Sequence, residues 1–340
     1  MTGVVCRRAV RTKLVSVVAP AALFFLACTG PSATGSAPSS ASTPSPQAIV
    51  PVAPPAASAA PVAIASAAPA ATAPAVPYDL DADRRLRLDE GKKELGARAA
   101  TQIVSDTFVF VSAPGTGSES FTPSVSLATS ALNAYYNNRF RTKPHEAISV
   151  YLFWTAASYE AYCKRTWNEP CLSKYGFFRP QERRIVMNAG LGLGTLTHEL
   201  VHPIVASDFP DAPTWINEGI ASLFEGPVIP RPGEIHGAKN WRLPRLRSAL
   251  TTTTEKSHAR PSGLFGLSHE AFRGDLEDLN YATARYFCQW LDQRNLLWPF
   301  YQAWRDDFAN DPNGDHAFLK VTGQTPSQAD PKFVTWLATL

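Results

Sequence analysis

A 49-residue stretch without a charged side chain limits which part of this 340-residue chain can fold. Residues 29–77 consist almost entirely of Ala, Pro, Ser, Thr, Val and Gly and contain 11 of the 29 prolines. Such a segment lacks the large side chains whose burial offsets the entropy cost of ordering a chain. Proline-rich linkers favour an extended backbone of about 3.1 Å per residue, so this one reaches on the order of 150 Å when fully extended. We therefore expect a disordered tether over 29–77 and a folded part over 78–340.

The first 28 residues have the pattern of an export signal. An uncharged, mainly apolar run over 14–27 follows four basic residues and precedes Cys28; the basic residues are Arg7, Arg8, Arg11 and Lys13. The run is shorter than the stretch of about 20 apolar residues that spans a bilayer. A membrane anchor or a buried helix is the alternative interpretation.

The end of this segment, Phe25-Leu26-Ala27-Cys28, resembles the lipobox of bacterial lipoproteins, although Phe25 stands where leucine is usual. The resemblance covers only residues 1–28. It implies cleavage before Cys28 and attachment of a lipid to this cysteine. The protein would then be exported and anchored to the bacterial cell envelope, at the outer membrane or the periplasmic face. The alternative is cleavage after Ala27 without lipid, which gives a secreted protein.

Hydrophobic periodicity in the folded part predicts an α+β fold. The first half alternates strands with helices: strands are expected over 101–113, 147–153 and 183–188, and helices over 79–99, 123–140 and 156–167. Strand signals fade after residue 213, where helices are expected over 213–225, 239–251, 281–294, 296–308, 314–321 and 326–340, with 252–275 irregular. We expect a small mixed sheet within a core over 78–230, followed by a helical C-terminal subdomain over 231–340.

The net charge and the cysteines indicate which binding partners and which cellular compartment the chain is suited to. The formal net charge is only +3, so nothing suggests a nucleic-acid partner, which would require a strong basic patch. Cys163 and Cys171 flank a loop-like stretch and are candidates for a local disulfide in an oxidising compartment. Cys288 lies in an apolar helical pattern and is expected to be a buried free thiol. Cys6 belongs to the export signal.

The segment GTLTHELVHPI, residues 194–204, contains the pattern H-E-x-x-H. On a helix, His198 and His202 lie on one face because they are four residues apart. Two such imidazoles can bind one zinc ion, and Glu199 can then reach a zinc-bound water as a general base. The alternative is an ordinary helix with two solvated histidines. Pro203 removes one backbone hydrogen bond, so the helix is expected to kink or end just after His202.

A catalytic zinc site needs a third protein ligand. Glu218 follows His202 by 16 residues, after a turn-like segment that lets a second helix fold back along the first. Glu218 is therefore the expected third ligand. Glu225, seven residues further on, is the competing candidate, although a role as partner of a nearby basic residue suits it better.

The motif over 198–202, followed by Trp215-Ile216-Asn217-Glu218-Gly219-Ile220-Ala221, resembles the gluzincin zinc metallopeptidases, with a close match over about 185–225. The resemblance implies a thermolysin-like architecture, in which a small sheet precedes the H-E-x-x-H helix and the glutamate helix. It also implies that the strand over 183–188 is the sheet edge that lines the cleft. His198, His202 and Glu218 would bind Zn²⁺, and Glu199 would activate water.

Many gluzincins also use a Tyr or a His to stabilise the oxyanion of the intermediate. Tyr281, 63 residues after Glu218, is the candidate here, and a core position at a helix start is the equally weighted alternative. His258 and His269 are weaker candidates. The candidates for the groups that orient the histidine rings are Asp208, Asp211 and Ser222, and the sequence does not decide among them.

The leading hypothesis is a zinc-dependent metallopeptidase that cleaves a peptide or protein substrate. The alternative is a non-catalytic surface lipoprotein that binds peptide or cell-wall ligands through a peptidase-like fold. The sequence does not decide between endopeptidase and aminopeptidase activity, and it contains no indication of an oligomeric state.

Overall fold

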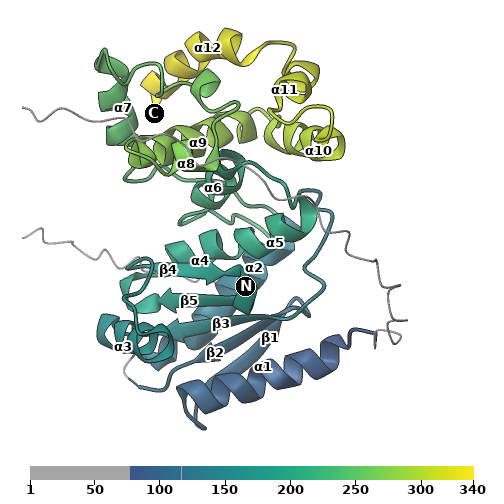
Figure 1. Cartoon of the computed structure of the whole chain (residues 1–340), viewed down its shortest axis with the longest axis vertical. Helices are drawn as coiled ribbons and strands as arrows, with labels where there is room; N and C mark the ends of the chain where they lie inside the picture. The colour runs from purple at the N-terminus through teal and green to yellow at the C-terminus, as the bar shows by residue number, and fades with distance from the viewer. Residues whose placement is uncertain (1–76, 116) are drawn as a thin grey trace, which may run out of the picture. The chain divides into compact units, whose positions relative to one another are not determined.

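Five short strands form one mixed sheet in the order β1-β2-β3-β5-β4 (Figure 1). The computed structural model describes residues 77–115 and 117–340, so the proposed export signal, Cys28 and nearly all of the tether lie outside the described residues. The strands are Ala100–Val104, Phe108–Ser112, Ile148–Phe153, Gly176–Arg179 and Arg184–Asn188, for β1 to β5 in chain order. β3 is parallel to β2 and to β5, whereas β1 and β4 are antiparallel to their neighbours. The predicted α+β class with a small mixed sheet is confirmed.

The single strand predicted over 101–113 is instead a hairpin of β1 and β2. Ala100 pairs with Ser112 at one end of the hairpin, and Val104 pairs with Phe108 next to the turn. Ser105 and Asp106 adopt positive φ angles of 50° and 62° in the connection. Two consecutive residues with positive φ are characteristic of the tight turns that match the twist of paired strands. The apolar run therefore reverses direction at these two residues.

The edge strand that borders the C-terminal half is β4, and the prediction that 183–188 forms this edge was wrong. β5 lies between β3 and β4 and is buried along its whole length. β4, the short sequence GFFR over Gly176–Arg179, pairs with β5 on one side only. A strand buried on both faces belongs in a sheet interior, so the more exposed β4 forms the edge.

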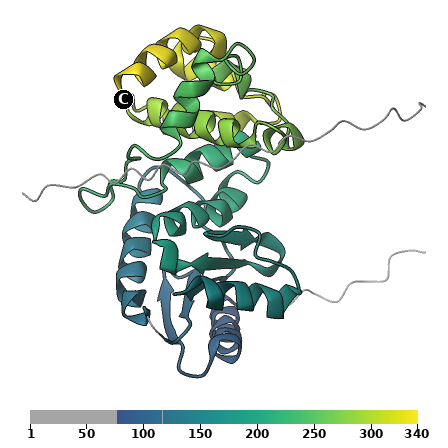
Figure 2. The same cartoon turned by 90° about the vertical axis from the view of Figure 1, so that its left-hand side faces the viewer.

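Helices cover both faces of the sheet (Figure 2). α1 (Leu80–Leu95) and α3 (Ala156–Trp167) lie against one face, whose core includes Val109, Tyr151 and Val186. α2 (Phe121–Tyr135) lies on the other face, where Phe110 and Ile185 belong to a larger apolar cluster. Because successive side chains of a strand point to opposite faces, Phe110 and its neighbour Val109 serve different cores.

The H-E-x-x-H segment forms two short helices, α4 (Gly194–Glu199) and α5 (Val201–Asp208), which meet at Leu200. Leu200 keeps helical dihedral angles (φ −65°, ψ −23°), so His198 and His202 still share a face. Pro203 lies in the first turn of α5, where proline is tolerated. The helix continues to Asp208, and its interruption precedes His202 instead of following it.

The remaining helices follow the predicted C-terminal order (Figure 1), except for the one-turn helix α8, which lies in the segment 252–275 that was expected to be irregular. They are α6 (Thr214–Leu223), α7 (Leu243–Thr251), α8 (His269–Phe272), α9 (Glu277–Asp292), α10 (Leu297–Asp307), α11 (Asp315–Thr322) and α12 (Pro326–Thr339). Trp215, in the first turn of α6, is fully buried and packs among Phe265, Phe287, Phe300 and Trp304. This aromatic cluster fixes α6 against the C-terminal helices and turns its opposite face towards α4.

A direct hydrogen bond also connects α4 to the end of α6. The hydroxyl of Thr197 donates to the carbonyl oxygen of Phe224 at 2.6 Å, and Tyr135 donates to the carbonyl oxygen of Thr197 at 2.8 Å. Thr197 is fully buried and immediately precedes His198. The spacing between the histidine helix and the glutamate helix is therefore set by protein groups.

The predictions for Cys163, Cys171 and Cys288 are confirmed, whereas Cys6 and Cys28 lie outside the described residues. Cys163 and Cys171 form a disulfide, and Cys288 is a buried free thiol among the described cysteines. Within residues 77–115 and 117–340, no helix combines the length and apolar character needed to span a membrane.

Candidate metal centre

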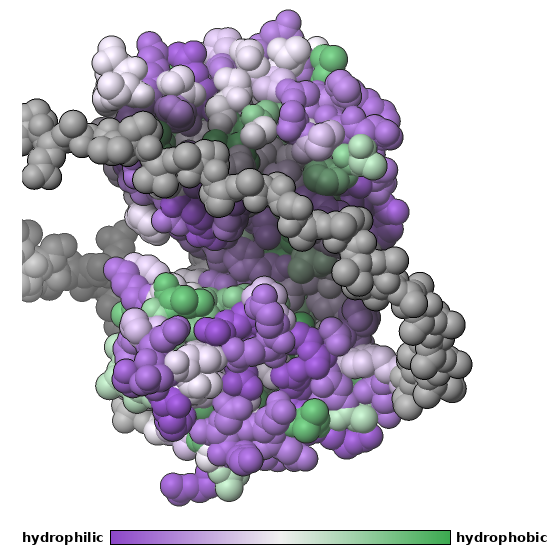
Figure 3. Space-filling model, viewed as in Figure 1, coloured by the Kyte–Doolittle hydropathy of each residue, from purple (hydrophilic) through white to green (hydrophobic). Residues whose placement is uncertain are grey.

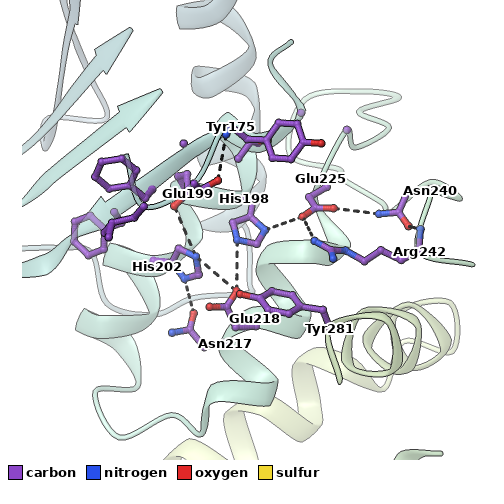
Figure 4. Close-up of a pocket in the computed structure, with 18 of the residues that line it drawn as sticks. Tyr175, His198, Glu199, His202, Asn217, Glu218, Glu225, Asn240, Arg242 and Tyr281 are labelled. Carbon is purple, nitrogen blue, oxygen red and sulfur yellow. Dashed lines mark hydrogen bonds and ion pairs between the residues drawn. The ribbon is translucent and has the colours of Figure 1, made fainter. Parts of the chain in front are cut away.

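Three side chains of the α4–α5 segment converge at the bottom of a cleft (Figure 4). The rings of His198 and His202 have their centroids 4.9 Å apart. Ligand atoms of His198, Glu199 and His202 lie within 4.8 Å of one another, a spacing that can hold a metal ion. His198 and Glu199 are buried, and His202 is partly buried. The sequence motif thus brings its three polar side chains to one point.

α6 brings Glu218 to the same point. Its Oε2 atom lies 3.5 Å from Nε2 of His198 and 3.9 Å from Nε2 of His202. Ligand atoms bound about 2.0–2.1 Å from a tetrahedral zinc ion lie roughly 3.3 Å from one another. The observed separations are slightly larger than this value, so a small inward movement would complete a three-ligand set.

An unpaired atom supports the same interpretation. Oε2 of Glu218 is buried and has no hydrogen-bond partner among the described residues. A buried carboxylate oxygen without a partner is costly, and a cation between the imidazoles would satisfy it. The donor set of two imidazole nitrogens and one carboxylate oxygen suits zinc. The residues present therefore fit such an ion.

The second nitrogen of each ring faces an acceptor from α6 or its C-terminal end. Nδ1 of His202 is hydrogen-bonded to Oδ1 of Asn217 at 3.0 Å, whereas Nδ1 of His198 lies 3.4 Å from Oε1 of Glu225 without a hydrogen bond between the two atoms. Acceptors in this position fix the ring orientation of metal-binding histidines. Both Nε2 atoms are thereby left to face Glu218.

The residues considered for this orienting role lie elsewhere. Asp208 accepts hydrogen bonds from the backbone amides of Arg141 and Thr142 and pairs with Arg305. The hydroxyl of Ser222 is buried without a partner among the described residues, and Asp211 does not line the cleft. Asn217 was within reach of sequence reasoning, because it directly precedes Glu218.

Glu225 contacts the far side of the His198 ring and does not share the position of Glu218. It also pairs with Arg242 at 2.8 Å and accepts a hydrogen bond from Asn240 at 3.2 Å. The expectation that Glu225 is the partner of a nearby basic residue is confirmed.

The carboxylates around the two histidines favour a positive charge at this position. Burial alone would lower the pKa of His198, but the adjacent carboxylates of Glu218 and Glu225 raise it to about 10. Burial would raise the pKa of Glu218, yet His202 and His198 hold it well below its ordinary value. Burial raises the pKa of Glu199, although both histidines act in the opposite direction. The same carboxylates that favour a proton on His198 would favour a metal cation in its place once the imidazole has lost that proton.

The cleft has a volume of about 990 Å³ and extends from β4 to α9. Gly176, Phe177 and Phe178 of β4 line one wall, and Arg242, Arg273 and Tyr281 line the opposite one. Hydrophilic residues dominate the surface in the view of Figure 3, and hydrophobic residues form small separate patches. Four exposed apolar residues line the cleft, namely Leu172, Tyr175, Leu191 and Trp241.

Tyr281, near the start of α9, lines the cleft beside Glu218 (Figure 4). Burial, followed by the negative charge of Glu218, raises its pKa well above the ordinary value. His258 and His269 are absent from the residues that line the cleft, and Nδ1 of His269 lies 3.0 Å from the hydroxyl of Thr214. Of the three candidates for oxyanion stabilisation, only Tyr281 lines the cleft that contains the candidate metal cluster.

No known protein family matches the sequence, and no curated protein matches it.

Proposed function

We propose that the protein is a zinc-dependent metallopeptidase of gluzincin type. The observation that carries this proposal is the convergence of three atoms, Nε2 of His198, Nε2 of His202 and the unpaired Oε2 of Glu218. Glu199 adjoins these atoms in a cleft wide enough for a peptide. A binding protein would need neither this three-ligand set nor an additional buried carboxylate beside it.

In the proposed mechanism, His198, His202 and Glu218 hold the ion. When bound, zinc polarises a carbonyl group and lowers the pKa of a coordinated water to near neutrality. Glu199 accepts a proton from the water and passes it to the departing amine, which requires a pKa near the working pH. Its burial raises the pKa in that direction. Tyr281 donates a hydrogen bond to the oxyanion.

The free edge of β4 supports a peptide substrate. An extended chain can pair with an unpaired strand edge through backbone hydrogen bonds. Gly176 and Phe178 lie on this edge and also line the cleft. The substrate would therefore lie along β4, with its scissile carbonyl near Glu199. The export signal and the lipid on Cys28 complete the proposal, placing the activity in the bacterial cell envelope.

The test is the zinc content of the purified full chain beside that of Glu218→Ala. One zinc per chain, reduced in the variant, is the expected result. Labelled casein and leucine aminomethylcoumarin then serve as probes for endopeptidase and aminopeptidase activity. A parent protein that binds no zinc after reconstitution at neutral pH contradicts the proposal. Tight zinc binding without cleavage of either probe would favour the non-catalytic surface lipoprotein.

A further inference from the structure

Arg273, in the turn between α8 and α9, contacts two residues of the proposed site at once. One guanidinium nitrogen, Nη2, donates to Oε1 of Glu218 at 2.6 Å. The other, Nη1, donates to the hydroxyl of Tyr281 at 2.6 Å and to Glu277 at 2.9 Å. Arginine presents its donors in a rigid plane, so these contacts fix both partners relative to one another.

The contact with Glu218 selects the oxygen that faces the histidines. Because Oε1 is bound to Arg273, the carboxylate is held with Oε2 towards the two Nε2 atoms. Without the guanidinium, the carboxylate could rotate and present either oxygen, or both. Arg273 thus favours a single-oxygen ligand in a defined orientation.

The contact with Tyr281 determines the direction of the phenol hydrogen. Arginine has donors and no acceptor, so the tyrosine oxygen must accept from Nη1. The hydrogen of Tyr281 then points away from Nη1, on the side of the hydroxyl that faces Glu218 and the cleft. The ring is also held between two guanidinium groups, with Cζ of Arg242 at 4.9 Å and Cζ of Arg273 at 5.3 Å from its centroid.

We propose that Arg273 is a positioning residue, whose guanidinium orients the metal-binding carboxylate of Glu218 and the hydroxyl of Tyr281 together. This inference rests on the proposed metallopeptidase function. A purely structural ion pair between α6 and the α8–α9 turn would affect mainly folding. A positioning role predicts effects on metal coordination and turnover that exceed any effect on folding.

The first measurement is metal binding by Arg273→Ala, Arg273→Lys and the parent full chain, using zinc competition and the visible spectrum of bound Co²⁺. Loss of a group that orients a ligand typically weakens metal binding about 10–100-fold. We expect a loss of this size in Arg273→Ala, together with a changed Co²⁺ spectrum. Arg273→Lys should recover zinc affinity through its charge, but it should not recover turnover, because one ammonium group cannot hold both partners.

Arg245→Ala is the matched control. Arg245 also pairs with two carboxylates, Glu255 and Asp278, and neither belongs to the proposed metal site. We expect parent-like zinc affinity and Co²⁺ spectrum in this variant. Circular dichroism and thermal unfolding of every variant separate loss of fold from loss of orientation.

The second measurement is casein cleavage at saturating zinc by Arg273→Ala, Tyr281→Phe and the double variant. If Arg273 acts on turnover through Tyr281, the double variant should be hardly slower than Tyr281→Phe. Losses that multiply contradict the action through Tyr281, and parent-like zinc affinity in a folded Arg273→Ala contradicts the action on Glu218. If that variant does not fold, unchanged turnover in Arg273→Lys contradicts it. A parent protein that binds no zinc contradicts the metallopeptidase function itself, and the Arg273 inference with it.

Discussion

At the scale of single residues, the candidate centre separates side chains that would touch the ion from those that orient them. His198, His202 and Glu218 converge through one atom each, while Asn217 and Glu225 contact the opposite ring nitrogens. Glu199 lies beside the ion position without being needed as a third ligand. This division of roles leads to two predictions with different outcomes.

Glu199→Gln should retain zinc and lose turnover. The amide keeps the size of the side chain but cannot accept a proton, and general base catalysis typically contributes about 10²–10⁴-fold. Zinc content and casein cleavage, measured on the same preparation, check this prediction. Casein cleavage at the parent's rate would show that Glu199 is not the base.

Asn217→Ala should weaken zinc binding while leaving all three proposed ligands in place. Removal of the acceptor at Nδ1 of His202 frees the ring to rotate, for which about 10–100-fold in affinity is typical. Zinc competition is the measurement. Asn137→Ala is the control, because Asn137 bonds the carbonyl of Gly233 away from the cleft. Equal affinities in the two variants would contradict the orienting role.

At the scale of elements, the loop between α3 and β4 is fixed to α3 by a disulfide. Cys163 and Cys171 are eight residues apart, and Leu172, which follows directly, lines the cleft. The same loop leads into the β4 edge. The disulfide therefore restrains one wall of the proposed substrate site as well as the fold.

Replacement of both cysteines by alanine should lower the free energy of unfolding by about 2–3 kcal/mol, the chain-entropy value for so short a loop. Urea unfolding of the parent and the double variant measures this difference. A reduced parent should behave like the variant. An unchanged unfolding midpoint would mean that the surrounding contacts, such as the Tyr159 hydroxyl bond to the carbonyl of Ser173, hold the loop without the disulfide.

α1 is attached to the sheet by a carboxylate with a shifted pKa. Burial alone would raise the pKa of Asp83, but hydrogen bonds from Tyr78 and Arg183 outweigh it and lower the pKa below the ordinary value of 3.8. A carboxyl group with a lower pKa in the folded state stabilises the fold above its unfolded pKa, and this contribution disappears as the pH falls through the folded pKa.

Asp83→Asn should therefore destabilise the protein at neutral pH and much less in acid. The difference in unfolding free energy between parent and variant should be constant above about pH 5 and shrink below pH 4. Thermal unfolding at a series of pH values measures this difference. A difference in unfolding free energy that increased towards low pH would contradict the assigned direction of the pKa shift of Asp83.

At the scale of the whole molecule, one close helix contact connects the candidate metal centre to the C-terminal helices. Gly219 follows Glu218 in α6, and a Cβ atom there would lie 2.8 Å from Sγ of Cys288 and 3.1 Å from the carbonyl oxygen of Ala284 in α9. The absence of a side chain thus permits the close approach of α6 and α9. The position of Glu218 depends on this approach.

Gly219→Ala should lower the free energy of unfolding by about 1–3 kcal/mol, the usual cost of overpacking a core, despite the higher helix propensity of alanine. It should also weaken zinc binding, because α6 must move. Gly274→Ala is the stability control, since its nearest contact would be an ordinary 3.4 Å. Greater stability in Gly219→Ala would show that the interface accommodates the methyl group.

The features that the sequence predicted correctly are those that depend on the spacing of nearby residues. His198 and His202 share a face because they are four residues apart on a helix, and the long C-terminal helices follow from periodicity over many residues. The hairpin turn at Ser105 and Asp106 was missed, because two short apolar strands around a polar pair resemble one longer strand. The four-residue β4 was missed for lack of length.

The side chains that surround the proposed ligands were less predictable. Arg273 is 55 residues from Glu218, and Arg242 is 17 residues from Glu225. Both are brought to the cleft by the packing of the C-terminal helices, and neither lies in a recognisable pattern. Such contacts depend on the tertiary packing and cannot be predicted from the spacing of residues along the chain.

The hydrogen bond from Thr197 to Phe224 has a consequence for how the protein matures. It fixes the spacing of the histidine and glutamate helices through protein groups alone. In a zinc finger, by contrast, the free energy of metal binding is the free energy of folding, and a chelator unfolds the domain. We therefore expect this chain to fold first and to bind the proposed zinc ion afterwards. A chelator should then yield a folded apoprotein that regains zinc when the metal is resupplied.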